Sequence, residues 1–578
     1  MRDGDPAGIA AFFTEDCFWR DLSAFTWNIT TMAGREAIAA MLAETLRRTA
    51  ASGWRLDGEA TEKGGVVEAW LTFETAVGRG KGYIRLRGDR CWTLLTSLEE
   101  LKGFEEKTGR RRVFGAEHGV HQGRQSWLER RQEEERSLGA DRQPYCVVVG
   151  GGQGGLALGA RLRRLGVPTI ILDKHDRPGD SWRKRYKSLC LHDPVWYDHM
   201  PYLPFPDDWP VYSPKDKIAD WLEMYARVME LNYWTRSECK SARFDEAKGE
   251  WTVEVDRDGK PVTLRPKHLV FATGMSGLPN EPDFPGMADF QGTQHHSSRH
   301  PGSEAWRGKR AVVIGSNNSA HDICADLWEN GADVTMVQRT STHVSTSDSL
   351  FRFGTSVLYS EAALDRGITT DKADLINASV PYAIMHELHK PVVAAIKAQD
   401  ADLYRRLEKA GFMLDFGDDE SGLHMKYMRR GSGYYIDVGA SDLIADRKIK
   451  LRSGVDVERI TEGGVLLGDG TELPADLIVY ATGYGNMVGW IGKLIGQDVA
   501  DRVGKVWGLG SATTKDPGPW EGEPRNMWKP TRQPNLWFQG GNLHQSRHYS
   551  QYLALQLKAR MEGIPTPVHG LAETHHKT

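Results

Sequence analysis

Three glycines spaced as Gly-x-Gly-x-x-Gly lie between a short apolar stretch, residues 145–149, and a stretch with helical periodicity, residues 156–165. In a loop that joins a strand to a helix, the first glycine permits a tight turn, the second lets backbone approach a pyrophosphate, and the third lets the helix pack closely on the strand. The helix N-terminus then offers free N–H groups and a positive dipole end to phosphate oxygens. The candidate phosphate-binding residues of this loop are Gly150, Gly152, Gln153, Gly154 and Gly155.

An acidic residue stands where the second strand of such a unit ends. Residues 168–172 predict a strand that leads into Asp173, 23 residues after Gly150. A carboxylate at this place binds ribose hydroxyls. The alternative, an ordinary Gly-rich turn, would not explain the position of the acid. We therefore interpret residues 145–173 as a dinucleotide-binding unit, with Asp173 and Lys174 as further candidate cofactor contacts.

A second, degenerate loop follows the apolar residues 310–314 and precedes a predicted helix that runs to residue 329. Asn replaces the middle glycine and tolerates left-handed backbone, whereas Ala replaces the last glycine and still allows close packing. The next strand ends in Arg339 rather than an acid, and an Arg there accommodates a 2′-phosphate. We therefore favour NADPH over NADH. Use of both coenzymes stays open, and so does the alternative that Arg339 is only a solvated cation at the end of the strand. The candidate contacts are Gly315, Ser316, Asn317, Asn318, Ser319, Ala320 and Arg339.

Further motifs follow both loops. A Gly-x-x-Trp-Arg pattern occupies residues 179–183, shortly after the acid, and Ala-Thr-Gly triplets end two predicted strands at residues 272–274 and 481–483. The order of loop, triplet, second loop and second triplet indicates one nucleotide-binding domain inserted within another. The candidate contacts in these motifs are Gly179, Trp182, Arg183, Gly274, Thr482 and Gly483.

A His-rich segment lies between the two nucleotide-binding loops. Phe290, Gly292 and His296 are followed by His300, four residues after His296. This spacing brings two imidazoles to one metal only on a helix, and the Ser-Ser-Arg sequence before Pro301 predicts a loop with no carboxylate or Cys beside it. We therefore expect no metal site here.

Together, these motifs resemble those of class B flavoprotein monooxygenases, over about residues 143–560. Phe290, Gly292 and His296 fit the fingerprint of flavin-containing and Baeyer–Villiger monooxygenases. The next fingerprint position is Tyr or Phe in the former and Trp in the latter, so His300 departs from both. Residues 189–206 are similar to plant auxin-forming flavin monooxygenases, and His192 falls where animal-type members carry an active-site Asn.

The resemblance implies an FAD- and NADPH-dependent monooxygenase that uses O₂ and a small organic substrate. It implies that NADPH reduces FAD and that O₂ adds at the flavin C4a position. The resulting (hydro)peroxide attacks a ketone, in a Baeyer–Villiger oxidation, or is attacked by a soft N or S atom. His296, His300 and His192 are candidate catalytic residues, and His192 and Asp193 are candidate flavin contacts, with a structural role for His192 equally open.

Two other functions compete with this interpretation. An NAD(P)H oxidase or flavin reductase would leave the N-terminal domain as the module that binds a ligand or partner. A flavin disulfide reductase needs a redox Cys pair, but the six cysteines are widely scattered in the sequence. Scattered cysteines are typical of reduced core residues in a cytoplasmic protein.

The predicted fold is α/β, with two Rossmann-like domains, the NADP domain inserted in the FAD domain, after a small α+β domain. The α+β part combines a helical start with antiparallel strands and resembles the SnoaL/NTF2-like cone that precedes type II flavin-containing monooxygenases. That cone opens with a long helix, so we expect the chain to begin partway through it. The expected boundaries are 1–103 for the cone, 104–142 for a charged linker, 143–285 for the first part of the FAD domain, 286–450 for the NAD(P) domain with a helical insertion, and 451–578 for the second part of the FAD domain and the tail.

The composition excludes several classes of protein. Among 578 residues, 74 Lys and Arg against 78 Asp and Glu give a net charge of −4, which offers no broad basic field for nucleic acid or an anionic membrane. No stretch approaches the ~18 apolar residues of a membrane span. We expect no nucleic-acid or membrane partner, and we leave a homodimer open.

Overall fold

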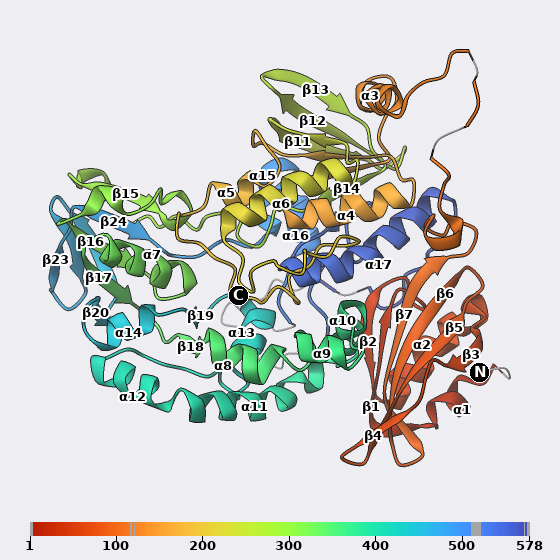
Figure 1. The fold of residues 1–578 in the computed structure, drawn as a ribbon, viewed down its shortest axis with the longest axis horizontal. Coiled ribbons are helices and arrows are strands. Elements are labelled where there is room, and N and C mark those ends of the chain that lie inside the picture. Colours follow the sequence, from red (N-terminus) through yellow and green to blue (C-terminus); the bar gives the residue numbers. More distant parts are fainter. Residues whose placement is uncertain (1–3, 116–117, 121, 510–521, 572, 575–578) are drawn as a thin grey trace.

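The computed structural model describes residues 4–115, 118–120, 122–509, 522–571 and 573–574 (Figure 1). The N-terminal domain lies at the lower right of this view, the second nucleotide-binding sheet at the far left, and a row of helices along the bottom. Two parallel five-stranded sheets with helices beside them form the core of the chain. The predicted α/β fold class is thus confirmed.

The N-terminal domain is a seven-stranded sheet with two helices. Its strand order is β2-β1-β7-β6-β5-β3, and β4 pairs with β5. The predicted helical start and antiparallel strands are present, and the first helix is short because strand β1 begins at Phe13. The bounds are α1 Pro6–Ala10, β1 Phe13–Leu22, β2 Ile29–Ala33, α2 Gly34–Thr49, β3 Ser52–Leu56, β4 Thr61–Lys63, β5 Val66–Glu74, β6 Gly78–Arg87 and β7 Arg90–Leu101.

Both faces of this sheet are covered. Successive side chains of a strand point to opposite faces. Trp19 of β1 packs in an apolar cluster with Phe25 and residues of α2, whereas Leu95 of β7 shares a cluster with Tyr552 near the end of the chain. One face therefore packs on the domain's own helix, and the other packs on the nucleotide-binding part of the chain.

The first nucleotide-binding sheet is built from two distant parts of the chain. Its strands run parallel in the order β10-β9-β8-β14-β25, and β25 comes from near the C-terminus. Helices α4 and α17 pack against each other beside it. The bounds are β8 Cys146–Val149, α4 Gln153–Arg164, β9 Thr169–Leu172, α5 Asp180–Arg183, α6 Lys215–Val228, β10 Tyr233–Trp234, β14 His268–Phe271, β25 Leu536–Phe538 and α17 Leu543–Met561.

The second nucleotide-binding sheet has the parallel order β15-β24-β16-β17-β20. Strand β24 pairs with β16, so this sheet continues past the domain boundary expected at residue 450, as far as Tyr480. The reason is that the returning strand completes the inserted sheet before the chain goes back to the first one. The bounds are β15 Thr293–His296, β16 Arg310–Ile314, α7 Asn318–Glu329, β17 Asp333–Gln338, β20 Lys450–Ser453 and β24 Leu477–Tyr480.

A helical insertion and three small sheets complete the described part of the chain. The insertion consists of β18 His343–Thr346, α8 Ser347–Leu350, α9 Glu361–Asp365, α10 Thr370–Ala378, α11 Tyr382–Gln399, α12 Ala401–Ala410, α13 Gly422–Arg430, β19 Tyr434–Asp437 and α14 Ala440–Ala445, with β18 and β19 paired. The antiparallel sheets are β11 Ser237–Asp245, β12 Glu250–Arg257 and β13 Lys260–Leu264, and β21 Val457–Thr461, β22 Gly464–Leu467 and β23 Glu472–Pro474. Helices α15 Val488–Leu494 and α16 Gln497–Val503 follow.

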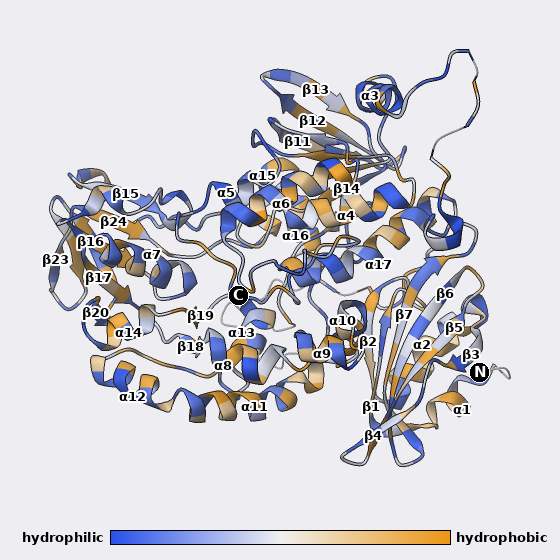
Figure 2. Cartoon of the chain, viewed as in Figure 1, coloured by the Kyte–Doolittle hydropathy of each residue, from blue (hydrophilic) through white to orange (hydrophobic). Residues whose placement is uncertain are grey.

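The charged linker forms helix α3, Trp127–Ser137, which is hydrophilic along its length, in contrast to the hydrophobic strands β16 and β17 (Figure 2). A capping box at Ser126 and Glu129 begins this helix. None of the helices in the described residues is long and apolar enough to cross a bilayer.

Candidate active site

The first Gly-rich loop has the geometry of a phosphate cradle. Gly150 has φ +108°, a conformation that favours glycine, and a Cβ there would overlap the carbonyl of Ala272. A Cβ at Gly155 would overlap the carbonyl of Gly150. Gly152 is the N-cap of α4 and supplies no side-chain cap, so the first N–H groups of the helix stay available. These features fit the pyrophosphate of a dinucleotide.

Asp173 closes this loop from the end of β9. Its carboxylate accepts hydrogen bonds from the backbone N–H of Gly151, at 2.8 Å, and of His175, at 2.9 Å. Burial would raise the pKa of Asp173, but the hydrogen bonds from His175 and Gly151 hold it below the ordinary value. An ionised acid thus lies beside the loop, as ribose binding requires. The neighbouring Lys174 is exposed.

Trp182 and Gln153 meet at the mouth of the same loop. The indole N–H of Trp182 donates to Gln153 Oε1 at 3.2 Å, and Gln153 Nε2 lies 3.4 Å from the carbonyl of Gly541. A Cβ at Gly154 would lie 3.3 Å from the Cα of Gly540. The loop, the Trp motif and the glycines before α17 therefore converge on one place.

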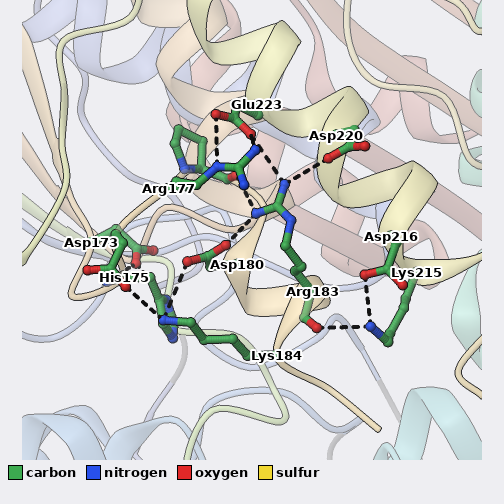
Figure 3. Close-up of polar contacts among 12 residues, drawn as sticks. Asp173, His175, Arg177, Asp180, Arg183, Lys184, Lys215, Asp216, Asp220 and Glu223 are labelled. Carbon is green, nitrogen blue, oxygen red and sulfur yellow. Dashed lines mark hydrogen bonds and ion pairs between the residues drawn. The ribbon is translucent and has the colours of Figure 1, made fainter. Parts of the chain in front are cut away.

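Arg183 instead belongs to an ion-pair cluster between α5 and α6 (Figure 3). Its guanidinium donates to Asp180, to Asp220 at 3.0 Å and to Glu223 at 3.3 Å. A Cβ at Gly179 would overlap the carbonyl of Ala219 on α6, so this glycine permits the contact of the two helices. The two residues of the Trp-Arg motif thus differ in role: Trp182 contacts the Gly-rich loop, and Arg183 connects α5 to α6.

The second Gly-rich loop repeats the cradle in degenerate form. Gly315 has φ +132°, and a Cβ there would overlap the carbonyl of Ala481 in the second triplet. Asn317 is the N-cap of α7 without a side-chain cap. The side chain of Asn318 accepts from the N–H of Ile436 at 2.9 Å and so ties the loop to β19. This helix N-terminus fits a second dinucleotide.

The remaining candidates of this loop differ in exposure. Ser316 hydrogen-bonds Thr342 at 2.8 Å, Ser319 is half-buried, and Ala320 is fully buried against the sheet. Arg339 is exposed just after β17, where the adenosine end of a dinucleotide lies in this fold.

The second triplet contacts His296 and the segment that follows the first triplet. The hydroxyl of Thr482 donates to the carbonyl of Asn280 at 2.7 Å, just beyond Gly274 along the chain. The carbonyl of Gly483 lies 3.0 Å from His296 Nε2. His296 Nδ1 in turn accepts from the N–H of Ser298 at 3.1 Å, so both ring nitrogens are engaged by the protein. His296 joins the connections between the nucleotide-binding domains.

His300 is also held within the fold. Its Nδ1 lies 3.1 Å from His295 Nε2, and its Nε2 lies 3.2 Å from Ser303, which donates to Asp326. Burial lowers the pKa of His300 to about 4. Among the described residues, no cluster of three His, Cys, Asp or Glu side chains could hold a metal ion. His300 is therefore placed as a neutral residue of the core.

His192 differs from these two because its pKa is raised, whereas burial lowers the pKa of His296 and of His300. Its Nε2 lies 3.7 Å from Asp322 Oδ2 on α7, and that oxygen accepts from Tyr186 at 2.6 Å. Burial would lower the pKa of His192, but the hydrogen bond and the charge of Asp322 raise it above the ordinary value. Within the described residues, His192 Nδ1 is buried and has no hydrogen-bond partner. The raised pKa favours the protonated form of His192.

Asp193 directly follows His192 in the chain. Burial raises its pKa to about 6. The side chains of Tyr197, Tyr427 and Tyr434 are close enough for the Asp193 charge to act on their pKa values. A carboxyl of this kind exchanges its proton near neutral pH.

Sequence reasoning missed the buried network behind this segment. Arg547 of α17 donates to both oxygens of Asp374 on α10, at 2.7 and 2.8 Å, and to the carbonyls of Tyr197 and His199. His544 lies 3.2 Å from Asp374. The signal that could have found these residues is the charged and His-rich start of a helix that leads into an otherwise apolar stretch.

Comparisons with known proteins show the family of this chain. A family model described as pyridine nucleotide-disulphide oxidoreductase matches residues 147–353. The chain is 33% identical over 350 residues to indole-3-pyruvate monooxygenase YUCCA1 of Oryza sativa subsp. japonica, which covers 60% of the chain and 79% of that relative. The chain belongs to the flavin monooxygenase family. The probable indole-3-pyruvate monooxygenase YUCCA9 of Arabidopsis thaliana is 29% identical over 353 residues, 60% of the chain and 76% of that relative.

Solved structures show the same fold. A cyclohexanone monooxygenase mutant from Rhodococcus sp. Phi1 bound to NADP⁺ superposes with a TM-score of 0.52 at 18% identity, over 73% of this chain and 86% of that one. The predicted family, the monooxygenase function and the cofactors FAD and NADPH are confirmed for this flavin monooxygenase. All six cysteines are free in the structure.

Proposed function

We propose that this monooxygenase oxygenates a carbonyl compound, a ketone or a 2-oxo acid, rather than a soft N or S atom. The observation that carries the proposal is the 33% identity, over 79% of the relative, to an enzyme named for indole-3-pyruvate, which is a 2-oxo acid. For a ketone the balanced reaction is ketone + O₂ + NADPH + H⁺ → ester + NADP⁺ + H₂O. FAD, when bound, supplies the electron transfer and oxygen activation.

The chain's own residues support carbonyl chemistry at His192. Negative charge develops on the oxygen of a carbonyl group under nucleophilic attack, and a positioned donor stabilises it. His192 has its proton supported by Asp322 on one side and a free Nδ1 on the other. Asp193 beside it can take up or release a proton near neutral pH.

Different residues would hold the two dinucleotides. Gly150 to Gly155 and Asp173 would hold FAD, with Trp182 and Gln153 at the mouth of the loop. Residues 315–320 would hold the pyrophosphate of NADPH, and Arg339 its 2′-phosphate; use of NADH as well stays part of the proposal. His296 and His300 would position the domain connections instead of touching substrate.

A substrate panel tests the choice of reaction. The holoenzyme with NADPH would be incubated separately with a cyclic ketone, an aryl 2-oxo acid, a tertiary amine and a thioether, and products would be identified by mass spectrometry. We expect an oxygenated product from a carbonyl compound. Formation of only an N-oxide or sulfoxide would reject the proposal, and conversion of all O₂ to H₂O₂ would favour the oxidase alternative.

Three further points concern the type of the N-terminal domain, the location of the enzyme and its oligomeric state. The N-terminal domain is of the SnoaL/NTF2-like type, supported by its largely antiparallel seven-stranded sheet with helix α2 against β1 and β2. The enzyme works in the cytoplasm, supported by six free cysteines. A homodimer stays open, and light scattering of the full chain would test it: a mass twice that of one chain would support the dimer, and the mass of one chain would reject it.

A further inference from the structure

Arg20 of the N-terminal domain is buried in the body of the monooxygenase. Its side chain is 1% exposed, and its guanidinium donates to both oxygens of Glu523, at 2.8 and 2.7 Å. It also donates to the carbonyl of Ala378 at 2.6 Å and to the hydroxyl of Tyr549 at 3.1 Å. One side chain from strand β1 thus holds the segment of Glu523, the end of α10 and the middle of α17.

The charge of Arg20 is matched at this interface. Glu523 is fully buried, and although burial would raise its pKa, the charge of Arg20 holds that pKa below the ordinary value. Tyr382 places its ring 4.7 Å from the guanidinium carbon. The pair is therefore a fixed, ionised contact and not a screened surface pair.

A second buried clamp shares both helices with the first. Asp374 lies one helical turn before Ala378 on α10, and Arg547 lies two residues before Tyr549 on α17. Arg547 joins Asp374 and also donates to the carbonyls of Tyr197, at 2.7 Å, and His199, at 2.8 Å. Those two carbonyls belong to the segment that carries His192 and Asp193.

Other contacts of the same sheet face reach the same elements. Arg85 of β6 donates to the hydroxyl of Ser379, just after α10, at 2.9 Å. The hydroxyls of Ser97 on β7 and Tyr552 on α17 are 2.9 Å apart. In Figure 1, α10 lies next to the N-terminal sheet, to which Arg20 of β1 connects it. The N-terminal domain thus grips α10 and α17 at several points.

We propose that the N-terminal domain positions the active-site segment, and that Arg20 is the positioning residue through which it acts. Arg20 fixes α10 and α17, these helices fix Asp374 and Arg547, and Arg547 fixes the backbone of residues 197–199. The domain would then support the oxygenation reaction by fixing the active-site segment, whichever substrate is oxygenated. An independent ligand-binding module would not need a buried ionised pair with the rest of the chain.

The test uses the full-length holoenzyme with Arg20→Met. Displacement of reacting groups by about 1 Å can cost ~100-fold in rate; we expect the fraction of NADPH converted to oxygenated product to fall by roughly tenfold, with H₂O₂ rising in its place. Hydrogen–deuterium exchange without substrate should show faster exchange in residues 190–206 and in α10. Arg87→Met, at an exposed ion pair of the same sheet, is the matched control and should change neither readout.

A double variant separates positioning from simple loss of a charge. Arg20→Met with Glu523→Gln leaves no unpaired buried carboxylate but still lacks the bonds to Ala378 and Tyr549. We expect it to fold, to retain FAD and to remain uncoupled, with fast exchange in residues 190–206. The proposal would be overturned if the double variant converted NADPH to oxygenated product, and exchanged in residues 190–206, as the wild type does. This outcome can be read even if the single variant fails to fold. The positioning proposal rests on the proposed function only for its product readout. Because hydrogen–deuterium exchange is measured without substrate, it tests positioning even if the substrate panel rejects the carbonyl proposal.

Discussion

At the scale of single residues, the three candidate histidines differ in what their ring nitrogens contact. His296 and His300 have both nitrogens engaged by protein groups, whereas His192 keeps Nδ1 free and faces Asp322 with Nε2. Proton donation to a substrate needs a free, correctly protonated nitrogen. We therefore propose that role for His192 and a positioning role for the other two.

Asp322→Asn tests this assignment through pH. The charge of Asp322 raises the pKa of His192, so its removal should lower that pKa. The imidazolium would then be lost at a lower pH, and the alkaline limb that it contributes to the kcat/KM profile should move to lower pH, by about one unit for each ~1.4 kcal/mol of lost interaction. An unchanged profile in a folded, FAD-containing variant would contradict the pairing.

Arg339→Ala tests coenzyme choice. The exposed guanidinium after β17 is available for a 2′-phosphate, which NADH lacks. We expect KM for NADPH to rise by roughly tenfold or more, the value of about one charge-assisted contact, and KM for NADH to change little. Arg405→Ala, at an exposed ion pair of α12, is the control. Equal effects on both coenzymes would reject the role.

At the scale of elements, the sequence predicted the strand–loop–helix units well because each carries its own local signal. Gly150 and Gly315 occupy backbone that favours glycine, and Asp173 lies beside its loop. Long-range pairings leave no such signal. The pairing of β24 with β16 and the contact of Arg547 with Asp374 join residues 166 and 173 positions apart, so neither could be read from the neighbouring sequence.

Gly155→Ala tests the first loop. The added Cβ would overlap the carbonyl of Gly150, which is backbone and has no side chain to move away. Overpacking of this kind costs about 1–3 kcal/mol, so we expect an enzyme that purifies with little FAD and unfolds at a lower temperature. Gly463→Ala meets no atom within 4 Å and should behave as wild type. Full FAD content in Gly155→Ala, read from flavin absorbance, would argue against the cradle.

At the scale of the whole molecule, buried ion pairs join the N-terminal domain, α10 and α17. The pKa values of Glu523 and Asp374 are held below their ordinary values in the folded chain, in each case because a buried arginine outweighs the effect of burial. Such groups stabilise the fold above their unfolded pKa values, near 4, and lose that contribution as pH falls. Acid should therefore remove the stabilising contribution of both ion pairs, and with it the contacts that join the N-terminal domain to the rest of the chain.

Thermal unfolding as a function of pH tests this coupling. Between pH 7 and 5 we expect one transition in which N-terminal and nucleotide-binding segments unfold together. Below about pH 4 we expect a steep loss of Tm, because the unfolded chain takes up protons on both carboxylates that the folded chain, with its lowered pKa values, does not yet bind. Exchange-resolved unfolding would assign the segments. A separate, earlier transition of residues 4–101 at neutral pH would show that the domain is not held as described.

The most direct test of the central claim follows the oxygen atoms. The holoenzyme would turn over its carbonyl substrate with NADPH under ¹⁸O₂, with NADPH, product and H₂O₂ all measured. A carbonyl-oxygenating monooxygenase predicts one labelled oxygen in each product molecule, one NADPH consumed for each product and little H₂O₂. Unlabelled product, or recovery of all the label as H₂O₂, would contradict the account.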